Sequence, residues 1–146
     1  MDNVLLIILA SASLNAAAGY KDELRCMTVN AYHEARSEGK MGALMVMDTV
    51  MNRKASPLYP NTVCRVVYQK VQFSWTKNPP KVRNRAEYNR IKKLAVEVLA
   101  GKWLGISDGS MFYHARSITP YWAKSYVVTK TINNHKFYGL PEEKKE

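Results

Sequence analysis

The sequence has little that would tie it to a metal site or to a membrane-spanning segment. It contains three histidines, and they form neither a helical i, i+4 pair nor an HExxH motif, which argues against a zinc enzyme. The strongly apolar run, residues 4–10, is shorter than the ~20 residues that cross a bilayer. We therefore expect no metal and no cofactor, and His33, His114 and His135 are predicted to serve other roles.

Acidic residues are also scarce, with 12 Asp and Glu against 22 Lys and Arg and a formal net charge of +10. This excess favours anionic partners: nucleic acid, a membrane surface or the acidic polymers of a cell wall. No helix-turn-helix, zinc or RNA-binding signature accompanies the charge, so we predict no nucleic-acid partner. One basic cluster is either a solvated face or a surface that holds the protein against a wall or membrane; it comprises Lys81, Arg83, Arg85, Arg90, Lys92 and Lys93.

Cysteine is limited to Cys26 and Cys64. In an oxidising compartment the two could pair and contribute at most roughly 4 kcal/mol through loop-closure entropy. In a reducing compartment they would be two small buried apolar residues. The count of two cysteines leaves both alternatives open.

The composition, 47% hydrophobic and 23% charged, is typical of one compact globular domain. Residues 1–20 form an apolar segment that matches an export signal only in part, because Asp2 is acidic and no basic residue precedes the apolar run. We expect this segment to be either a signal or anchor or a first helix packed on the domain. Residues 21–140 are predicted to form the functional domain, and residues 141–146 a charged tail.

The apolar spacing predicts a helix from Asp22 that ends at Gly39 and a second helix over residues 41–53 whose methionine-rich stripe is core. Residues 63–67 are expected to form a short helix capped by Asn61, and residues 72–75 an extended piece. Asn84 and Glu87 make a capping box for a helix over residues 85–100. A strand over residues 111–115 and a hairpin over residues 126–132 and 135–138 complete the set. The predicted class is α+β, mostly helical, with a small late β-sheet.

The stretch AYHEARSEG carries Glu34 and Glu38 on one helix face. Such a pair is usually a solvated polar face. Near a helix C-terminus, however, negative potential and partial burial raise the pKa of a carboxyl group toward neutrality, which suits a general acid. The residues alone make Glu34 a candidate and do not decide between these interpretations.

Five separated motifs occur in order along the chain: CMTVNAYHEARSEG, GALMVMDTVMNRKASPLYPNTVCRVVYQ, QFSW, MFYHARSITPYWA and TINNHKFYG. In this order they resemble the SleB-like cell-wall hydrolases (spore cortex-lytic and CwlJ-type enzymes), a family that includes many phage lysis proteins. The resemblance covers residues 26–139 and implies a lysozyme-like fold. It also implies that Glu34 is the catalytic acid of a lytic transglycosylase, which cleaves the bond from N-acetylmuramic acid to N-acetylglucosamine and leaves a 1,6-anhydro end. Ser37 stands where the family commonly has glycine.

The same motifs suggest which residues surround Glu34. Gln72, Ser74 and Trp75 are expected to line the sugar cleft, and Tyr113 and His114 to lie on its side, with Trp122 in the core. Arg36 and Glu38 are assigned supporting roles, since a transglycosylase needs a single carboxylate whereas most glycosidases need two.

Two alternatives remain at this stage. One is a muramidase that hydrolyses the same bond, and the other is a non-catalytic basic module that binds wall polymers or nucleic acid. The expected partners are peptidoglycan glycan strands and, for a phage enzyme, virion proteins. The expected location is the periplasm or cell wall, reached by export or phage delivery, or the phage virion itself.

Overall fold

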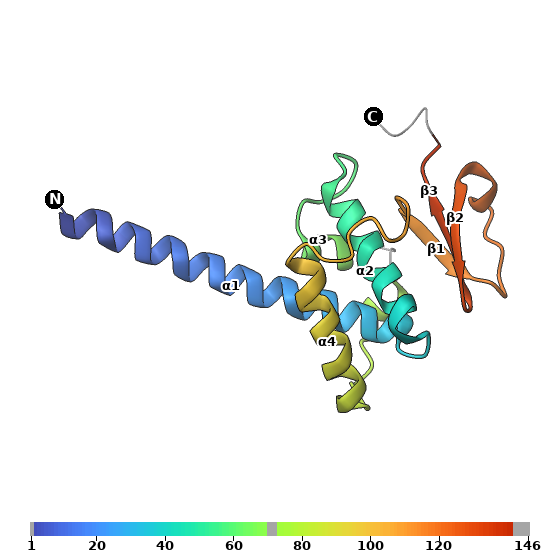
Figure 1. Cartoon of the computed structure of the whole chain (residues 1–146), viewed down its shortest axis with the longest axis horizontal. Helices are drawn as coiled ribbons and strands as arrows, with labels where there is room; N and C mark the ends of the chain where they lie inside the picture. The colour runs from blue at the N-terminus through green and yellow to red at the C-terminus, as the bar shows by residue number, and fades with distance from the viewer. Residues whose placement is uncertain (1, 70–72, 142–146) are drawn as a thin grey trace.

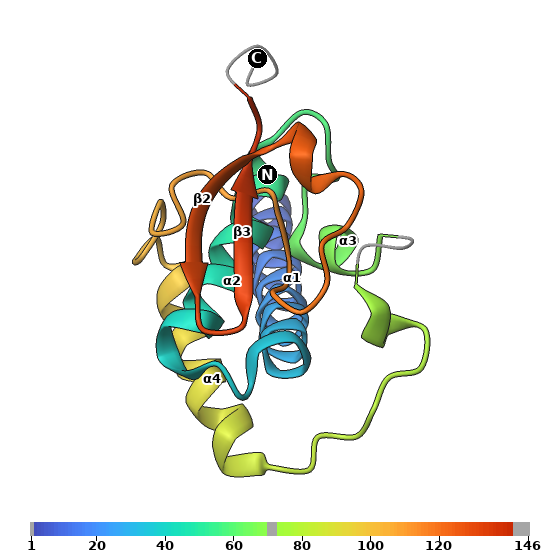
Figure 2. The ribbon, with the colours of Figure 1, turned by 90° about the vertical axis from the view of Figure 1, so that its right-hand side faces the viewer.

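Over the residues that the structure describes, the fold combines four α-helices with one antiparallel sheet (Figures 1 and 2). The computed structural model describes residues 2–69 and 73–141, and it describes side chains from Gly19 onward with the exception of Ser74. The expected class, α+β and mostly helical, is confirmed. The elements in chain order are α1 (Asp2–Ala35), α2 (Gly39–Ala55), α3 (Val63–Val67), the 3-10 turn η1 (Ser74–Thr76), α4 (Arg85–Leu99), β1 (Phe112–Ala115), the 3-10 turn η2 (Ala123–Ser125), β2 (Val127–Ile132) and β3 (His135–Gly139).

Helix α2 is the centre of the helical part. The stretch from Gly42 to Val50 is buried on every face, so the methionine-rich stripe predicted as core is core. Helices α1, α3 and α4 pack against it, and α1 adds Met27 and Tyr32 to the same cluster. Figure 1 shows the sheet beside α2, at the opposite end of the molecule from the N-terminal part of α1. Over the part of the chain that was searched, no helix is long and apolar enough to cross a bilayer.

Several boundaries differ from the sequence-based expectations for local reasons. Helix α1 ends at Ala35 because a tight turn follows, and Gly39, with φ of +74°, begins α2 instead of ending α1. Thr62, and not Asn61, caps α3, because its hydroxyl accepts from the Arg65 amide. The piece around Trp75 is a 3-10 turn instead of an extended segment.

The elements with strong local signals are confirmed. The Asn84 side chain accepts a hydrogen bond from the Glu87 amide at 3.0 Å and so begins α4 where the sequence predicted. Strands β2 and β3 form the predicted hairpin, and Asn133 makes its turn with φ of +51°. Strand β1 pairs with β3 on the other side, which gives the sheet order β1-β3-β2.

A buried polar network fixes the loop that leads into β1 against α2. The Asp48 carboxylate accepts hydrogen bonds from the amides of Gly105 and Ser107, at 3.0 and 2.9 Å. The next residue of α2, Thr49, donates to the Ser110 hydroxyl at 2.9 Å. Because each of these buried polar groups has a partner, the network specifies where β1 starts relative to α2.

Glu38 connects the turn after α1 to the distant β2–β3 turn. Its carboxylate, in a residue only 6% exposed, accepts from the Asn134 amide at 3.2 Å and lies 3.5 Å from Nδ1 of His135. The Asn133 side chain donates to the Glu38 carbonyl. A Cβ at Gly42 would come within 2.3 Å of the Glu38 Cβ, so glycine there leaves room for the Glu38 side chain.

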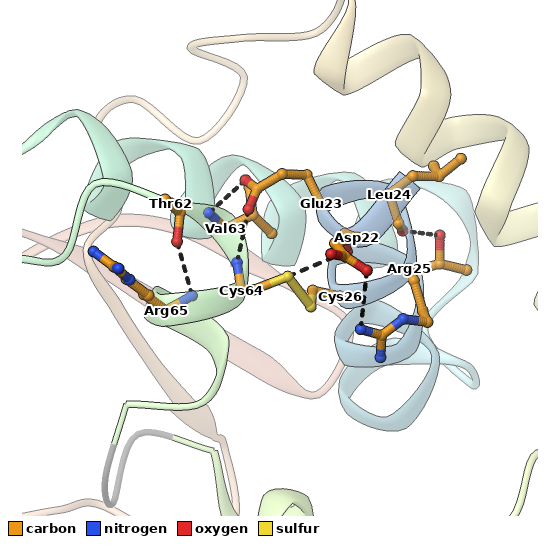
Figure 3. The surroundings of a disulfide bond; sticks show 10 residues. Asp22, Glu23, Leu24, Arg25, Cys26, Thr62, Val63, Cys64 and Arg65 are labelled. Carbon is orange, nitrogen blue, oxygen red and sulfur yellow. Dashed lines mark hydrogen bonds and ion pairs between the residues drawn. A yellow bond between two sulfur atoms is a disulfide. The ribbon is translucent and has the colours of Figure 1, made fainter. Parts of the chain in front are cut away.

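The two cysteines form a disulfide that joins α1 to α3, with the Cα atoms of Cys26 and Cys64 5.2 Å apart (Figure 3). Beside it, the Glu23 carboxylate accepts from the amides of Val63 and Cys64 at 2.6 and 3.3 Å. A carboxylate at a helix N-terminus satisfies free N–H groups and is favoured by the helix dipole. Together these contacts fix the short helix α3, which leads to Trp75.

Replacing both cysteines (Cys26→Ser with Cys64→Ser) should lower the free energy of unfolding by about 4 kcal/mol, because the bridge closes a 38-residue separation in the unfolded chain. Urea unfolding of the two proteins measures the difference. Dithiothreitol should bring the native protein to the level of the variant and leave the variant unchanged. Equal stability of both proteins without reductant would show that the bridge does not constrain the chain.

Glu38→Ala should destabilise the protein by about 1–3 kcal/mol, because the amide and imidazole groups of the hairpin turn lose their acceptor. Glu38→Gln is the matched control, since its amide oxygen still accepts a hydrogen bond and should retain most of the stability. Denaturant titration of the two variants measures the effect. Equal losses for alanine and glutamine would assign the effect to the charge of Glu38 and not to the hydrogen bonds.

Candidate active site

Glu34 lies in the last turn of α1 and its side chain is partly buried. Burial raises the pKa of the Glu34 carboxyl, and the Tyr113 hydroxyl and the Arg53 charge act in the opposite direction. The three groups come from three elements: α1, α2 and the edge strand β1. A carboxyl in this setting holds its proton to higher pH than an exposed glutamate, and a cation close by favours the carboxylate once the proton has left.

Tyr113 presents its hydroxyl to this site from β1. Its ring packs against Phe137 and His135, with centroids 5.2 and 5.4 Å away, and against Phe73 at 6.3 Å. The hydroxyl lies near enough to the Glu34 carboxyl for each group to change the other's pKa. Burial, followed by the charge of Glu34, raises the pKa of Tyr113 well above its usual value. Tyr113 is therefore a neutral donor at physiological pH.

Arg53 is a buried cation beside Glu34. It is 4% exposed, and its Nε donates to the Met111 carbonyl at 2.7 Å. Its guanidinium carbon lies 5.3–5.5 Å from the ring centres of three aromatic residues, Tyr59, Phe73 and Phe112. Among the described residues, nothing accepts a hydrogen bond from its Nη1.

Arg53 was not predicted as a site residue, although the sequence carries a signal. Val46 and Val50 lie on one face of the helix predicted over residues 41–53, and Arg53 follows Val50 by three residues on that same face. A charged residue in line with core positions is rarely buried unless it has an interaction partner.

Trp75, which was predicted to line the cleft, is buried in the core beside the last turns of α1. Its indole Nε1 donates to the Asn30 side chain at 2.8 Å, one helical turn before Glu34. Its ring lies 4.9 Å from His33 and 5.7 Å from Tyr68, and Tyr68 is 47% exposed. Burial lowers the pKa of His33, so this histidine is neutral at physiological pH. The aromatic cluster thus extends from the Glu34 turn of α1 to the surface.

The other predicted site residues lie elsewhere. His114 and Tyr113 are adjacent in β1 and so occupy opposite faces of the sheet. His114 bonds the Tyr138 hydroxyl at 2.8 Å and packs with Trp122, which is only partly buried. Arg36 is exposed and stacks on Tyr32. Gln72 and the side chain of Ser74 lie outside what the structure describes.

Glu38 was assigned a supporting role, and its carboxylate contacts the backbone amide and the imidazole of the hairpin turn. The groups that act on the pKa of Glu34 are Tyr113 and Arg53, and Glu38 is not among them. In the part of the chain that was searched, no three His, Cys, Asp or Glu side chains gather as a metal site would require. The described site therefore offers one carboxylate, one buried cation and one neutral hydroxyl.

Curated proteins similar to this chain include two spore cortex-lytic enzymes. That of Halalkalibacterium halodurans is 28% identical over 125 residues, covering 84% of this chain and 37% of the relative. That of Bacillus subtilis is 23% identical over 128 residues, covering 87% and 41%. The chain thus spans about two fifths of the length of these relatives.

Two solved structures share the fold at 23% sequence identity. The catalytic domain of the Bacillus cereus SleB protein superposes with a TM-score of 0.68, covering 81% of this chain and 90% of that one. The catalytic domain of the germination-specific lytic transglycosylase SleB from Bacillus anthracis gives 0.64, covering 80% and 93%. These likenesses confirm the expected lysozyme-like fold.

The profile of one protein family, described as cell wall hydrolase, matches residues 37–138. The match takes in α2, α4 and most of the sheet, and it begins three residues after Glu34. Because it covers more than half of the sequence, the chain belongs to the cell wall hydrolase family.

Proposed function

We propose that this protein cleaves peptidoglycan glycan strands at the bond from N-acetylmuramic acid to N-acetylglucosamine, as a lytic transglycosylase. The observation that carries the proposal is the partly buried Glu34 carboxyl, with its pKa raised by burial, between the neutral Tyr113 hydroxyl and the buried Arg53 cation. Membership of the cell wall hydrolase family and the similarity to the Bacillus anthracis lytic transglycosylase support the substrate and the reaction.

In the proposed reaction Glu34 first acts as an acid. Its carboxyl proton passes to the glycosidic oxygen, the bond from that oxygen to C1 of muramic acid breaks, and N-acetylglucosamine leaves with a free 4-hydroxyl. The Glu34 carboxylate then takes the proton of the C6 hydroxyl of muramic acid as that oxygen bonds to C1. The product is a 1,6-anhydro sugar, Glu34 regains its proton, and no water is consumed.

Burial of Glu34 and its two polar neighbours, Arg53 and Tyr113, support opposite halves of this cycle. Burial favours the protonated Glu34 that the first step needs, whereas Arg53 and Tyr113 favour the carboxylate that the second step needs. A general acid/base works best when neither form is too strongly favoured. The two influences together keep the pKa of Glu34 within a range where both steps are accessible.

A hydrolytic muramidase is the alternative enzyme, and it would need a second carboxylate to activate water. Glu38 is the nearest carboxylate in sequence, and its oxygens are already held by Asn134 and His135. The neutral Tyr113 is a poor base. These contacts favour the transglycosylase.

Location and wall contact are also proposals. The Cys26–Cys64 disulfide suits an oxidising compartment, in agreement with action outside the cytoplasm. The six basic residues around the start of α4 are exposed, and of these Arg90 pairs with Glu87. The remaining charge provides a salt-sensitive attraction to an anionic wall, which is also the basis of the non-catalytic alternative.

Glu34→Gln should reduce the release of soluble fragments from peptidoglycan by at least about 100-fold, because the amide cannot donate or accept the transferred proton. Mass spectrometry should find anhydro-muropeptides from the native protein. Asp22→Asn is the matched control, since it removes an exposed carboxylate from the same helix and should leave activity unchanged. Reducing-end products would indicate hydrolysis, and a lytic Glu34→Gln protein would remove Glu34 from the mechanism.

The high-pH limb of the activity profile should reflect loss of the Glu34 proton. Tyr113→Phe removes a group that lowers the pKa of Glu34, so the pKa should rise and the limb should move to higher pH. Initial rates of fragment release as a function of pH measure the shift. Tyr138→Phe removes a hydroxyl that bonds His114 on the other face of the sheet, and it should leave the limb in place. A shift to lower pH in Tyr113→Phe would contradict this account.

A further inference from the structure

His135 lies at the start of β3, on the face of the sheet that also carries Tyr113. Phe137 pairs with Tyr113 across the strands, and His135 precedes Phe137 by two residues, so the three side chains share this face. The His135 side chain is 14% exposed. No step of the proposed proton transfer uses its imidazole, so the position of this group calls for a separate explanation.

The imidazole contacts two groups that lie far apart in the sequence. Its ring meets the Tyr113 ring edge-on, with the centroids 5.4 Å apart and the planes at 87°. Its Nδ1 lies 3.5 Å from the Glu38 carboxylate. Glu38 stands in the turn that links α1 to α2, four residues after Glu34. The imidazole therefore lies between the Tyr113 ring and the turn that follows Glu34.

The rings that pack against Tyr113 differ in what holds them. Phe73 and Phe137 pack against it at tilted angles of 37° and 40°, and their side chains have no polar atom. Of these three rings, that of His135 is the one that a polar contact ties to the segment after Glu34. Edge-on aromatic pairs favour a defined geometry, so a movement of Tyr113 away from Glu34 would disturb its contact with His135.

The charge of His135 follows from its surroundings. Burial lowers the pKa of His135, the Glu38 carboxylate acts in the opposite direction, and His114 adds to the lowering. Glu38 faces the imidazole from the turn after α1, Tyr113 and His114 lie beside it on β1, and β2 places the apolar Ile132 opposite it. Since its pKa is lowered from the ordinary value of 6.5, His135 is neutral at physiological pH and above.

The pKa of Glu34 responds to burial, to Tyr113 and to Arg53, and His135 is not among the groups that act on it. A neutral imidazole also exerts little Coulombic force on a carboxyl group. An influence of His135 on the pKa of Glu34 must therefore pass through the position of the Tyr113 hydroxyl.

We propose that His135 is a positioning residue, whose imidazole, held by Glu38, fixes the Tyr113 ring so that the Tyr113 hydroxyl reaches the Glu34 carboxyl. The inference rests on the proposed function, in which Glu34 gives and takes the proton. Without the imidazole ring, the Tyr113 hydroxyl moves away from Glu34 and ceases to lower its pKa. The pKa of Glu34 then rises, as expected when the hydroxyl itself is removed.

His135→Asn tests this role, because asparagine keeps an amide near the position of Nδ1 but has no ring. The contact with Glu38, and with it most of the stability, should be retained. The Glu34 carboxyl is titrated by carbon NMR, with its signal assigned from the Glu34→Gln spectrum. The pKa of Glu34 should rise by most of the shift that Tyr113→Phe causes, and the high-pH limb of fragment release should move to higher pH by the same amount.

A double-variant cycle separates positioning from a general loss of structure. In the Tyr113→Phe background, His135→Asn should add no further shift to the pKa of Glu34, because the hydroxyl that it positions is absent. His135→Phe keeps a ring against Tyr113 and loses the polar contact with Glu38, so it should lower stability and leave the pKa of Glu34 near its native value. His114→Asn makes the same change on the opposite face of the sheet and should leave this pKa unchanged.

An unchanged pKa of Glu34 in His135→Asn, or a full shift on top of that of Tyr113→Phe, would overturn the positioning role. If His135→Asn does not fold, His135→Phe decides the question, since a rise as large as that of Tyr113→Phe would equally overturn it. A native protein that releases no fragments would reject the proposed function. The carboxyl titration needs no turnover and would still decide on His135.

Discussion

In the proposed reaction the Glu34 carboxyl must be withdrawn from water far enough to keep its proton and must still be able to lose it, and the fold meets this constraint with one group from each of three elements. Helix α1 supplies the carboxyl, α2 the buried Arg53 cation and β1 the neutral Tyr113 hydroxyl. The cation and the hydroxyl lower the pKa that burial raises. A shift of an element by one residue would change this balance, because electrostatic interactions strengthen where water is excluded.

Separate contacts hold each of the three elements in place. The Asp48 network fixes the approach to β1 against α2, and Glu38 fixes the far end of the same hairpin against the end of α1. The disulfide fixes α3 against α1, two turns before Glu34, and the turn that carries Trp75 follows α3 in the sequence. The polar groups of these contacts are paired, whereas the Arg53 Nη1 has no hydrogen-bond partner among the described residues. A buried donor of this kind is uncommon away from functional sites.

Local signals in the sequence were sufficient to predict most of the helices and strands, but they were insufficient to predict how the site is assembled. The Asn84 cap and the Asn133–Asn134 turn act on their immediate neighbours, so α4 and the hairpin were predicted closely. The contact of Glu38 with Asn134 joins residues 96 apart, and no local pattern encodes it. That Tyr113 and His114 lie on opposite faces of the sheet could have been predicted, because neighbouring residues in any strand point to opposite sides. The sequence also allowed the prediction that Arg53 faces the core, from its spacing after Val50. Its stacking against three aromatic rings could not be predicted, because it depends on segments that only the fold brings together.

The use of Glu38 as a structural clamp bears on which reaction the site can support. A carboxylate that accepts from a backbone amide and lies 3.5 Å from an imidazole nitrogen is stabilised in place, and moving it to activate water would break both contacts. Tyr113 cannot replace it as a base, since burial raises its pKa. The site is thus left with Glu34 as the group that can both give and take a proton. In transglycosylation the nucleophile is the C6 hydroxyl of the substrate itself, so no second base is needed. The presence of a single suitable carboxyl is therefore the physical argument for transglycosylation over hydrolysis at this site.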